Sequence, residues 1–508
     1  MARPLFRYAL VPLLAFVALS AWTLSSPVGA SPDEDFHLVS IWCGQGISSG
    51  DCENSGHSDE RLVPEALPGA PSCYAFHAET SAGCQSALFV DESDHLQSTA
   101  RGNFEGLYPP VFYFAMNFFV GDDISRSVIL MREVNAALFV GLVTALYWVL
   151  PRGRRPMLVV GTAVALVPLG LFIVPSINPS SWAVLSSTLA FPAMVGFFES
   201  TGRRRIALAG IAGVATLAAA GARADAALYA AFAIALAVLM SRSVRLREWK
   251  LLAYPLLLCV ICAISFLSSG QNEAASVGLD GSQDPAQGLA AQIVNDLLNV
   301  PALWAGSLGS WGLGWLDTSM PAVVWVVDLA VFGGIVLIGM NTTDGRKTLG
   351  FIGTLAAAWV IPTIVLVQSQ AQVGSQVQPR YILPLLILLA QVALFRVEPS
   401  RGELSAVQLR LVVAALSVTA AISLHFNMRR YITGSEVLGW NLDKAREWWW
   451  AIPAPPMVVW VLGSLAFGAA LFLGTRGLVR PDERTLAGTS PSAGAVTAPS
   501  PIAEPATR

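Results

Sequence analysis

Residues 8–24 read YALVPLLAFVALSAWTL, an uncharged and largely apolar run that decides how this chain folds. A transmembrane helix needs roughly 20 predominantly apolar residues, so this run and its flanks predict a membrane span. Further runs of the same kind follow, and the fold class predicted is an all-α polytopic membrane protein with about 12 (11–13) transmembrane helices. The further predicted spans are Ser127–Leu150, Met157–Val174, Ser181–Phe198, Arg205–Gly221, Ala224–Met240, Leu251–Leu267, Ala322–Met340, Thr348–Val367, Tyr381–Phe395, Leu411–His425 and Met457–Gly474.

The composition agrees with lipid as the main solvent. Of the 508 residues, 54% are hydrophobic and 13% are charged, whereas soluble globular proteins carry about 25% charged residues. The net charge is −3 at pH 7, and the sequence has no Lys/Arg-rich run interleaved with aromatic residues. Nucleic acid is therefore excluded as a predicted partner.

Basic residues in the short connections set the predicted orientation, because Lys and Arg are enriched in cytoplasmic loops. With the N-terminus inside, the basic connections all fall on the cytoplasmic side, and both termini are predicted to be cytoplasmic. One long outer loop departs from this pattern with Arg429, Arg430, Lys444 and Arg446, but long loops follow the rule weakly. The inside residues are Arg3, Arg7, Arg152, Arg154, Arg155, Arg203, Arg204, Arg205, Arg242, Arg245, Arg247, Lys250, Arg346, Lys347, Arg396, Arg401 and Arg410.

The spans divide the chain into membrane and outer segments. The first segment is interpreted as a signal anchor, although the small residues Val28–Ala30 leave a cleaved secretory signal as an alternative. The predicted divisions are the anchor 1–24, an outer loop 25–126, spans 127–267, an outer loop 268–321 with an interfacial helix, spans 322–425, a Trp-rich outer loop 426–456, the last span 457–474 and a disordered cytoplasmic tail 475–508.

A thirteenth apolar run, Leu107–Gly121, lies in the first outer loop. If it crossed the membrane, every later basic connection would lie outside. It is therefore predicted to be an in-plane or re-entrant helix on the outer side. Pro109 and Pro110 favour a helix that begins at this point.

Four of the six cysteines lie in the first outer loop, at Cys43, Cys52, Cys73 and Cys84. An even set in an oxidising compartment suggests two disulfides, with free thiols as the alternative. Three pairings exist, and the sequential one, Cys43–Cys52 with Cys73–Cys84, is favoured. The remaining pair, Cys259 and Cys262, falls inside a predicted span and is interpreted as small core residues.

The segment Ser31-Pro32-Asp33-Glu34-Asp35-Phe36-His37 directly follows the first span. Three carboxylates and a histidine at the membrane boundary can hold a cation or act as a general base. The simpler interpretation is a solvated loop with a helix N-cap at Ser31 or Asp33. The residue types alone leave both interpretations open.

Several short motifs add a family resemblance. An acidic pair after the first span resembles the hallmark of the GT-C superfamily of membrane glycosyltransferases, which use polyprenyl-phosphate-linked sugars. Tyr108-Pro109-Pro110-Val111-Phe112-Tyr113 resembles their HPPLYY-type segment, with Tyr108 in place of the usual histidine. Together with the motifs below, the chain resembles the bacterial membrane family called domain of unknown function 2142, which is grouped with GT-C proteins by fold. The added motifs are Asn178-Pro179, Arg223-Ala224-Asp225, Gly314-Trp315-Leu316-Asp317 and Arg380-Tyr381-Ile382-Leu383-Pro384.

The resemblance implies roles for these residues. Asp33, with Glu34 second, is the candidate base that takes a proton from an acceptor hydroxyl. Arg380, with Arg223 second, is the candidate cation for a lipid phosphate, because a guanidinium matches phosphate oxygens bidentately. A divalent metal ion on Asp33, Glu34 and His37 is a candidate cofactor. The full substrate-binding set is Asp35, His37, Tyr108, Asn178, Arg223, Asp225, Asp317, Arg380 and Tyr381.

Each nomination has a structural alternative. Arg380 can extend to phospholipid headgroups, Arg223 and Asp225 can pair to close a hairpin, and Asp317 can cap a helix. Asn178 with Pro179 is also typical of a turn. The tryptophans Trp304, Trp311, Trp315, Trp440 and Trp448–Trp450 are typical of an interfacial belt, with a sugar platform as the other interpretation.

The function predicted is an inverting GT-C-type glycosyltransferase on the outer face of the cell membrane. It would transfer a sugar from a polyprenyl-phosphate donor to an envelope glycan or lipid acceptor. The alternatives are a transporter or flippase for lipid-linked glycans and a catalytically silent scaffold. Transporters usually carry repeats and ionisable groups near the midplane, whereas the middles of these predicted spans are almost free of charge and no convincing internal repeat is found. A fold alone does not guarantee activity.

Overall fold

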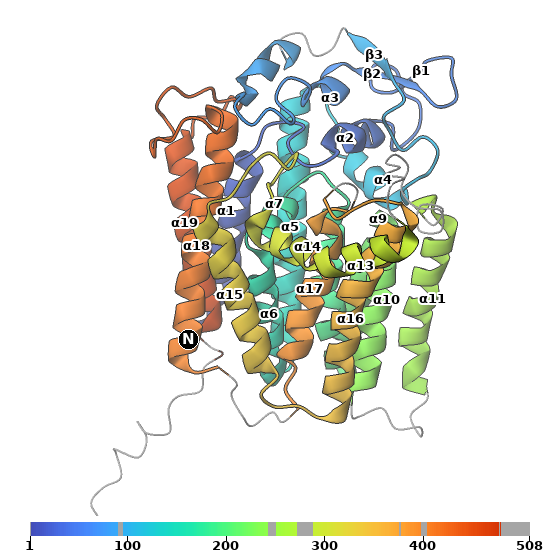
Figure 1. Cartoon of the computed structure of the whole chain (residues 1–508), viewed down its shortest axis with the longest axis vertical. Coiled ribbons are helices and arrows are strands. Elements are labelled where there is room, and N and C mark those ends of the chain that lie inside the picture. The colour runs from blue at the N-terminus through green and yellow to red at the C-terminus, as the bar shows by residue number, and fades with distance from the viewer. Residues whose placement is uncertain are drawn as a thin grey trace, which may run out of the picture.

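The computed structural model describes residues 2–89, 95–241, 250–271, 288–374, 377–397, 404–476 and 478, without the side chains of the first eight residues. It consists of an upright helical bundle and a smaller layer that covers one end of the bundle (Figure 1). The small layer is built mainly from the first outer loop. The predicted tail falls almost entirely outside the described residues, as do Arg242–Arg247 and Arg401.

Within the described residues, eight helices are long and apolar enough to cross a membrane, and three apolar helices are shorter. This confirms the multi-pass class, while the total of about 12 spans stays a prediction. The bundle helices are α1 (Ala2–Leu24), α5 (Ile124–Val149), α6 (Arg155–Leu166), α7 (Leu169–Ile173), α8 (Ser180–Glu199), α9 (Gly202–Ala222), α10 (Ala224–Met240), α11 (Ala253–Ser268), α15 (Ala322–Gly339), α16 (Gly345–Gln368), α17 (Pro379–Ala393), α18 (Ala406–Ile432) and α19 (Pro456–Thr475).

Two predicted spans differ in detail from the structure. The run Met157–Val174 is broken into α6 and α7, because Pro168 has no backbone N–H and interrupts the helix ladder. The span predicted at Leu411–His425 continues to Ile432, so the outer loop begins after that residue instead of at Phe426. The basic pair Arg429–Arg430 lowers the hydropathy and so ends the predicted span. In the structure both residues are buried in the last turn of the helix.

Helix α8 forms the centre of the bundle. Its residues from Ser180 to Phe198 are all buried, and it packs against α5, α9, α10 and α17. A helix that is apolar on all sides belongs in such a position. By contrast, α11 on the periphery exposes Leu256, Leu257 and Ile264. Exposed apolar faces of this kind are stable in lipid.

The covering layer contains short elements held by two disulfides. The bonds Cys43–Cys52 and Cys73–Cys84 confirm the sequential pairing. Three antiparallel strands lie in the order β1-β2-β3. The elements are α2 (Glu34–Trp42), β1 (Glu53–Asn54), β2 (Arg61–Pro64), α3 (Ala66–Gly69), the 3-10 helix η1 (Ala82–Phe89), β3 (Leu96–Thr99) and α4 (Val111–Asn117).

Helix α4 corresponds to the predicted outer helix at Leu107–Gly121. It begins directly after Pro110, as the double proline indicates, but it ends at Asn117. A helix of this length rises only about 10 Å, far less than the ≈ 30 Å hydrocarbon core. It lies beside α2 in the covering layer and does not cross the bundle (Figure 1).

The second outer segment also contains helices. They are α13 (Leu289–Asn299), α14 (Pro301–Ala305) and the π-helical turn η4 (Gly306–Ser310), and α13 packs across α16 near the covered end of the bundle. Leu289, Val294 and Leu298 of α13 are exposed. This apolar face is typical of a helix that lies at a membrane interface.

Basic connections meet at the end of the bundle opposite the covering layer, where the N-terminus also lies (Figure 1). Arg154 pairs with Glu199 at 2.6 Å and donates to the carbonyl of Arg396 at 2.6 Å. Arg346 donates to the carbonyl of Ser241 at 2.9 Å. Residues from several predicted inside connections thus share one face, while the side of the membrane that this face occupies stays a prediction.

Candidate active site

Asp33 stands where the first span gives way to α2. It occupies the N-cap position of α2 with φ 56°, and its side chain makes no capping hydrogen bond. The side-chain amide of Asn178 donates to the carbonyl of Pro32 at 2.8 Å and so fixes the backbone just before Asp33. The left-handed conformation is uncommon for a residue with a side chain. It leaves the carboxylate free for contacts elsewhere.

Those contacts are with two arginines from distant parts of the chain. Nη2 of Arg380 lies 2.6 Å from Oδ2 of Asp33, and Nη2 of Arg101 lies 3.2 Å from Oδ1. Burial acts to raise the pKa of Asp33, but the positive charges of Arg380 and its other neighbours outweigh burial and lower the pKa to about 2. Asp33 is therefore ionised at neutral pH.

Arg380 begins α17 and points into the protein. Its side chain is 2% exposed, and its Nη2 also donates to the hydroxyl of Tyr381 at 3.0 Å. Its Nε and Nη1 are buried and have no hydrogen-bond partner. Such unpaired buried donors are costly, and each one needs an explanation. The inward direction differs from the headgroup interpretation.

Arg380 lines a narrow pocket between the bundle and the covering layer. The chain around Asp33 reaches this pocket through Pro32, and the loop before α15 reaches it through Gly314 and Leu316. Leu169 of α7 lies on another wall. The guanidinium of Arg380, with Nε and Nη1 unpartnered, therefore lies at a junction of four segments that are far apart in the sequence.

A second guanidinium lies close by. Nε and Nη2 of Arg223 pair with both oxygens of Asp225, at 2.8 and 3.0 Å, across the turn between α9 and α10. The same guanidinium lies over the ring of Tyr381 at 4.8 Å and over the ring of Tyr108 at 5.6 Å. Arg223 thus closes the hairpin and also contacts the tyrosine that binds Arg380.

Aromatic residues surround the acidic motif. The ring of His37 lies 5.5 Å from that of Tyr108, and its Nδ1 lies 3.0 Å from the hydroxyl of Tyr113. Burial, assisted by the nearby arginines, lowers the pKa of His37 to about 3, although the charge of Asp33 acts in the other direction. Burial raises the pKa of Tyr108 to about 12. At neutral pH both rings are uncharged.

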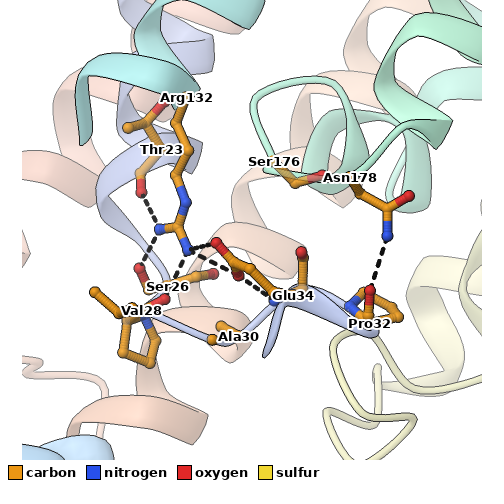
Figure 2. A network of polar contacts seen from close by, with 12 residues as sticks. Thr23, Ser26, Val28, Ala30, Pro32, Glu34, Arg132, Ser176 and Asn178 are labelled. Atoms are coloured by element: carbon orange, nitrogen blue, oxygen red, sulfur yellow. Dashed lines mark hydrogen bonds and ion pairs between the residues drawn. The ribbon is translucent and has the colours of Figure 1, made fainter. Parts of the chain in front are cut away.

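Glu34 belongs to a different network, although it adjoins Asp33 in sequence. Its carboxylate accepts hydrogen bonds from Nη2 of Arg132, at 2.8 and 3.1 Å, and from the backbone N–H of Ser31, at 2.8 Å. Arg132 also donates to the carbonyls of Thr23, Ser26 and Pro27. Figure 2 shows this network joining the end of α1 to α5. The side chains of Arg132 and Glu34 are 3% and 0% exposed, so this buried pair fixes the segment before Asp33 against α5.

Two further nominated carboxylates bind arginines. Asp35 accepts two hydrogen bonds from Arg101, which also contacts Asp33. Asp317 accepts Nη2 of Arg430 at 2.7 Å, and their side chains are 7% and 1% exposed. Asp317 thus fastens the loop before α15 to the end of α18, a contact distinct from the predicted helix cap.

The arrangement of the acidic motif does not favour the predicted metal site. In the described ranges of the chain, no group of three or more His, Cys, Asp and Glu side chains is placed to hold a metal ion. The physical reason is visible in the motif itself. Glu34 turns to Arg132, His37 bonds to Tyr113, and Asp33 turns to Arg380.

Sequence reasoning missed Arg101 and Arg132. Arg101 lies in an ordinary polar loop after β3, and no local pattern marks it. Arg132 had a usable signal, because an arginine inside a predicted span is expected to have a buried partner.

Comparison with known proteins supplies the family. No curated protein matches the chain significantly. A family model with the description "Predicted membrane protein (DUF2142)" matches residues 16–389, a region that includes the acidic motif, Arg223 and Arg380. The chain therefore belongs to this family of predicted membrane proteins.

Proposed function

We propose that this protein is a GT-C-type membrane glycosyltransferase. It takes a sugar from a polyprenyl-phosphate donor on the extracytoplasmic face and transfers it to an envelope glycan or lipid acceptor. About 12 spans and cytoplasmic termini belong to the same proposal. The observation that carries it is the pairing of ionised Asp33 with Arg380, a buried arginine with two nitrogens that have no hydrogen-bond partner beside a pocket.

Arg380 is suited to the donor phosphate. Its unpartnered Nη1 can donate to one phosphate oxygen while Nη2, which now contacts Asp33, donates to a second, and this paired donation is the bidentate geometry that guanidinium groups favour. Burial strengthens this interaction, because the local dielectric constant is lower than that of water. The pocket is lined by Pro32, in the segment that follows α1, and by the start of α17, so a phosphate at the outer membrane surface could reach it.

Asp33 is suited to the acceptor. As the acceptor oxygen bonds to the anomeric carbon, the bond from that carbon to the phosphate oxygen breaks and its electron pair stays on the phosphate. The acceptor proton passes to Asp33. This single displacement inverts the anomeric centre. Arg380 stabilises the phosphate that leaves.

The two roles are coupled through the ion pair. In the structure Arg380 holds Asp33, which makes the carboxylate a weak base. A phosphate on Arg380 would share its positive charge, so the pKa of Asp33 would rise. Donor binding would thus prepare the base, while Arg223 and Tyr381 would position the same headgroup.

The proposal is tested with purified protein in lipid nanodiscs, polyprenyl-phosphate sugars and a lipid or glycan acceptor. We expect transfer by the native protein and none by Asp33→Asn. Asp123→Asn is the matched control, because Asp123 stands at the start of α5 and does not line the pocket. Its carboxylate pairs with the exposed Arg126 at 2.8 Å. Equal transfer by both variants would remove Asp33 from the mechanism. Movement of the lipid-linked sugar in sealed vesicles without transfer would indicate a transporter. Absence of both transfer and movement would indicate a scaffold.

A further inference from the structure

An exposed phenylalanine of the covering layer packs against a partly buried tryptophan. Phe76 is 70% exposed, and its ring centroid lies 5.3 Å from that of Trp315 at an interplanar angle of 63°. Phe76 comes from the first outer loop and Trp315 from the loop before α15. We call Phe76 and Trp315 the aromatic shelf.

The segment that carries Phe76 is firmly held. The Cys73–Cys84 disulfide closes it, and the hydroxyl of Tyr74 donates to the carbonyl of Val28 at 2.6 Å. Arg430 donates to the carbonyl of Tyr74 at 2.7 Å. The exposure of Phe76 is therefore a property of an anchored loop, and the ring is held in place before any ligand arrives.

The shelf adjoins the pocket of Arg380. The indole Nε1 of Trp315 donates to the carbonyl of Gly29 at 2.9 Å, in the segment that leads to Asp33. The next residue, Leu316, lines the pocket together with Arg380. A ligand on the shelf would therefore lie at the edge of the site where transfer is proposed.

Backbone strain gathers along the same path. Among the described residues, five that are not glycine have positive φ. Three of them are Asp33 at 56°, Leu316 at 63° and Phe76 at 65°. Conformations of this kind persist only where the surroundings enforce them, and they cluster at functional sites. The edge contact with Trp315 leaves most of the Phe76 ring exposed, so packing within the protein gives little reason for this position.

We propose that the aromatic shelf binds a pyranose ring of a carbohydrate acceptor. The apolar C–H face of a sugar ring can pack on the exposed ring of Phe76, with Trp315 as the second surface. His77 and Glu79 follow in the same loop, with side chains 63% and 55% exposed, and can donate to or accept from sugar hydroxyls. These polar neighbours favour a water-facing sugar site over a membrane contact. The role as an acceptor site rests on the proposed transferase function.

The test measures saccharide binding without any donor. Mannohexaose, maltohexaose and galactohexaose are added to the full-length protein in nanodiscs, and saturation-transfer NMR reports contact with the sugar ring protons. We expect binding of at least one hexasaccharide, a loss of affinity of about tenfold or more in Phe76→Ala, and retention in Phe76→Trp. Phe118→Ala is the matched control, because Phe118 is 66% exposed and lies 5.3 Å from Phe114 in a similar edge contact.

Hydroxyl-radical labelling of Phe76 in the same nanodiscs gives a second readout. Strong labelling that falls when the saccharide is added supports the shelf. Protection by the lipid alone would indicate a membrane contact and overturn the proposal, as would absence of saccharide binding or equal loss in Phe76→Ala and Phe118→Ala. Failure of the two proposals is distinguishable. Saccharide binding that depends on Phe76, without sugar transfer, would leave a glycan-binding site and remove the transferase. Sugar transfer with an acceptor KM unchanged by Phe76→Ala would remove only the shelf.

Discussion

The guanidinium of Arg380 lies 2.6 Å from the carboxylate of Asp33, although 347 positions separate them in the chain. One residue precedes α2 and the other begins α17, so the contact joins the covering layer to the bundle. Two nitrogens of the same guanidinium, Nε and Nη1, remain unpartnered beside the pocket. This combination is the basis of the first prediction.

Replacement of Arg380 by Lys should lower sugar transfer by about 100-fold or more, because a lysine keeps the charge but cannot donate bidentately to a phosphate. The measurement is kcat/KM for the lipid-phosphate donor. Arg126→Lys, at an exposed arginine in the first turn of α5, serves as the control and should retain full activity. Full activity of Arg380→Lys would show that bidentate binding is not required.

The buried pair of Arg132 and Glu34 should behave as a unit in stability. Arg132→Met leaves an uncompensated buried carboxylate and should destabilise the protein by about 3–5 kcal/mol. The double variant Arg132→Met with Glu34→Gln should recover part of this loss, because the unpaired charge is gone. Thermal unfolding in nanodiscs measures both. If the loss in the double variant equals the sum of the losses in Arg132→Met and in Glu34→Gln alone, the pair is not coupled.

Stability should depend on His37 in mildly acidic solution. Its pKa falls from 6.5 to about 3 on folding, so between these values the unfolded chain binds a proton that the folded protein excludes. Stability is then lost as pH falls below about 6.5, with a slope that approaches about 1.4 kcal/mol per pH unit. Unfolding followed at several pH values should show a shallower slope for His37→Gln, while His77→Gln, at an exposed histidine, should match the native protein. Identical slopes for all three proteins would contradict the buried neutral histidine.

The two disulfides should differ in function more than in stability. They close loops of similar length, with sequence separations of 9 and 11, so removal of either should cost a similar amount, about 2–4 kcal/mol. Only the paired change Cys73→Ser with Cys84→Ser frees the segment of Phe76, and it should weaken saccharide binding. Calorimetry and the NMR titration measure the two effects. Equal weakening in the Cys43→Ser, Cys52→Ser protein would place the cause in general unfolding.

The orientation gives a final prediction. A fluorescent protein fused after Arg508 should fold and fluoresce in cells, because the C-terminus is expected in the cytoplasm. An alkaline phosphatase fused after Ser58, in the covering layer, should be active because it would be exported. The opposite result in both fusions would place Asp33 on the cytoplasmic face and remove the proposed route to an extracytoplasmic donor.

The sequence by itself determined the membrane class, the run of apolar segments, the sequential disulfides and the family. These properties depend on local sums of hydropathy, on the spacing of cysteines and on short motifs. It also brought Asp33 and Arg380 to the same predicted face.

Only the tertiary structure decided which charged groups meet. Asp33 and Glu34 are neighbours in the chain, yet the start of α2 turns one toward Arg380 and the other toward Arg132. Arg101 joins the site from a loop that carries no local signal. The physical reason is that an ion pair depends on distances across the packed bundle, and hydropathy and local spacing contain no information about those distances.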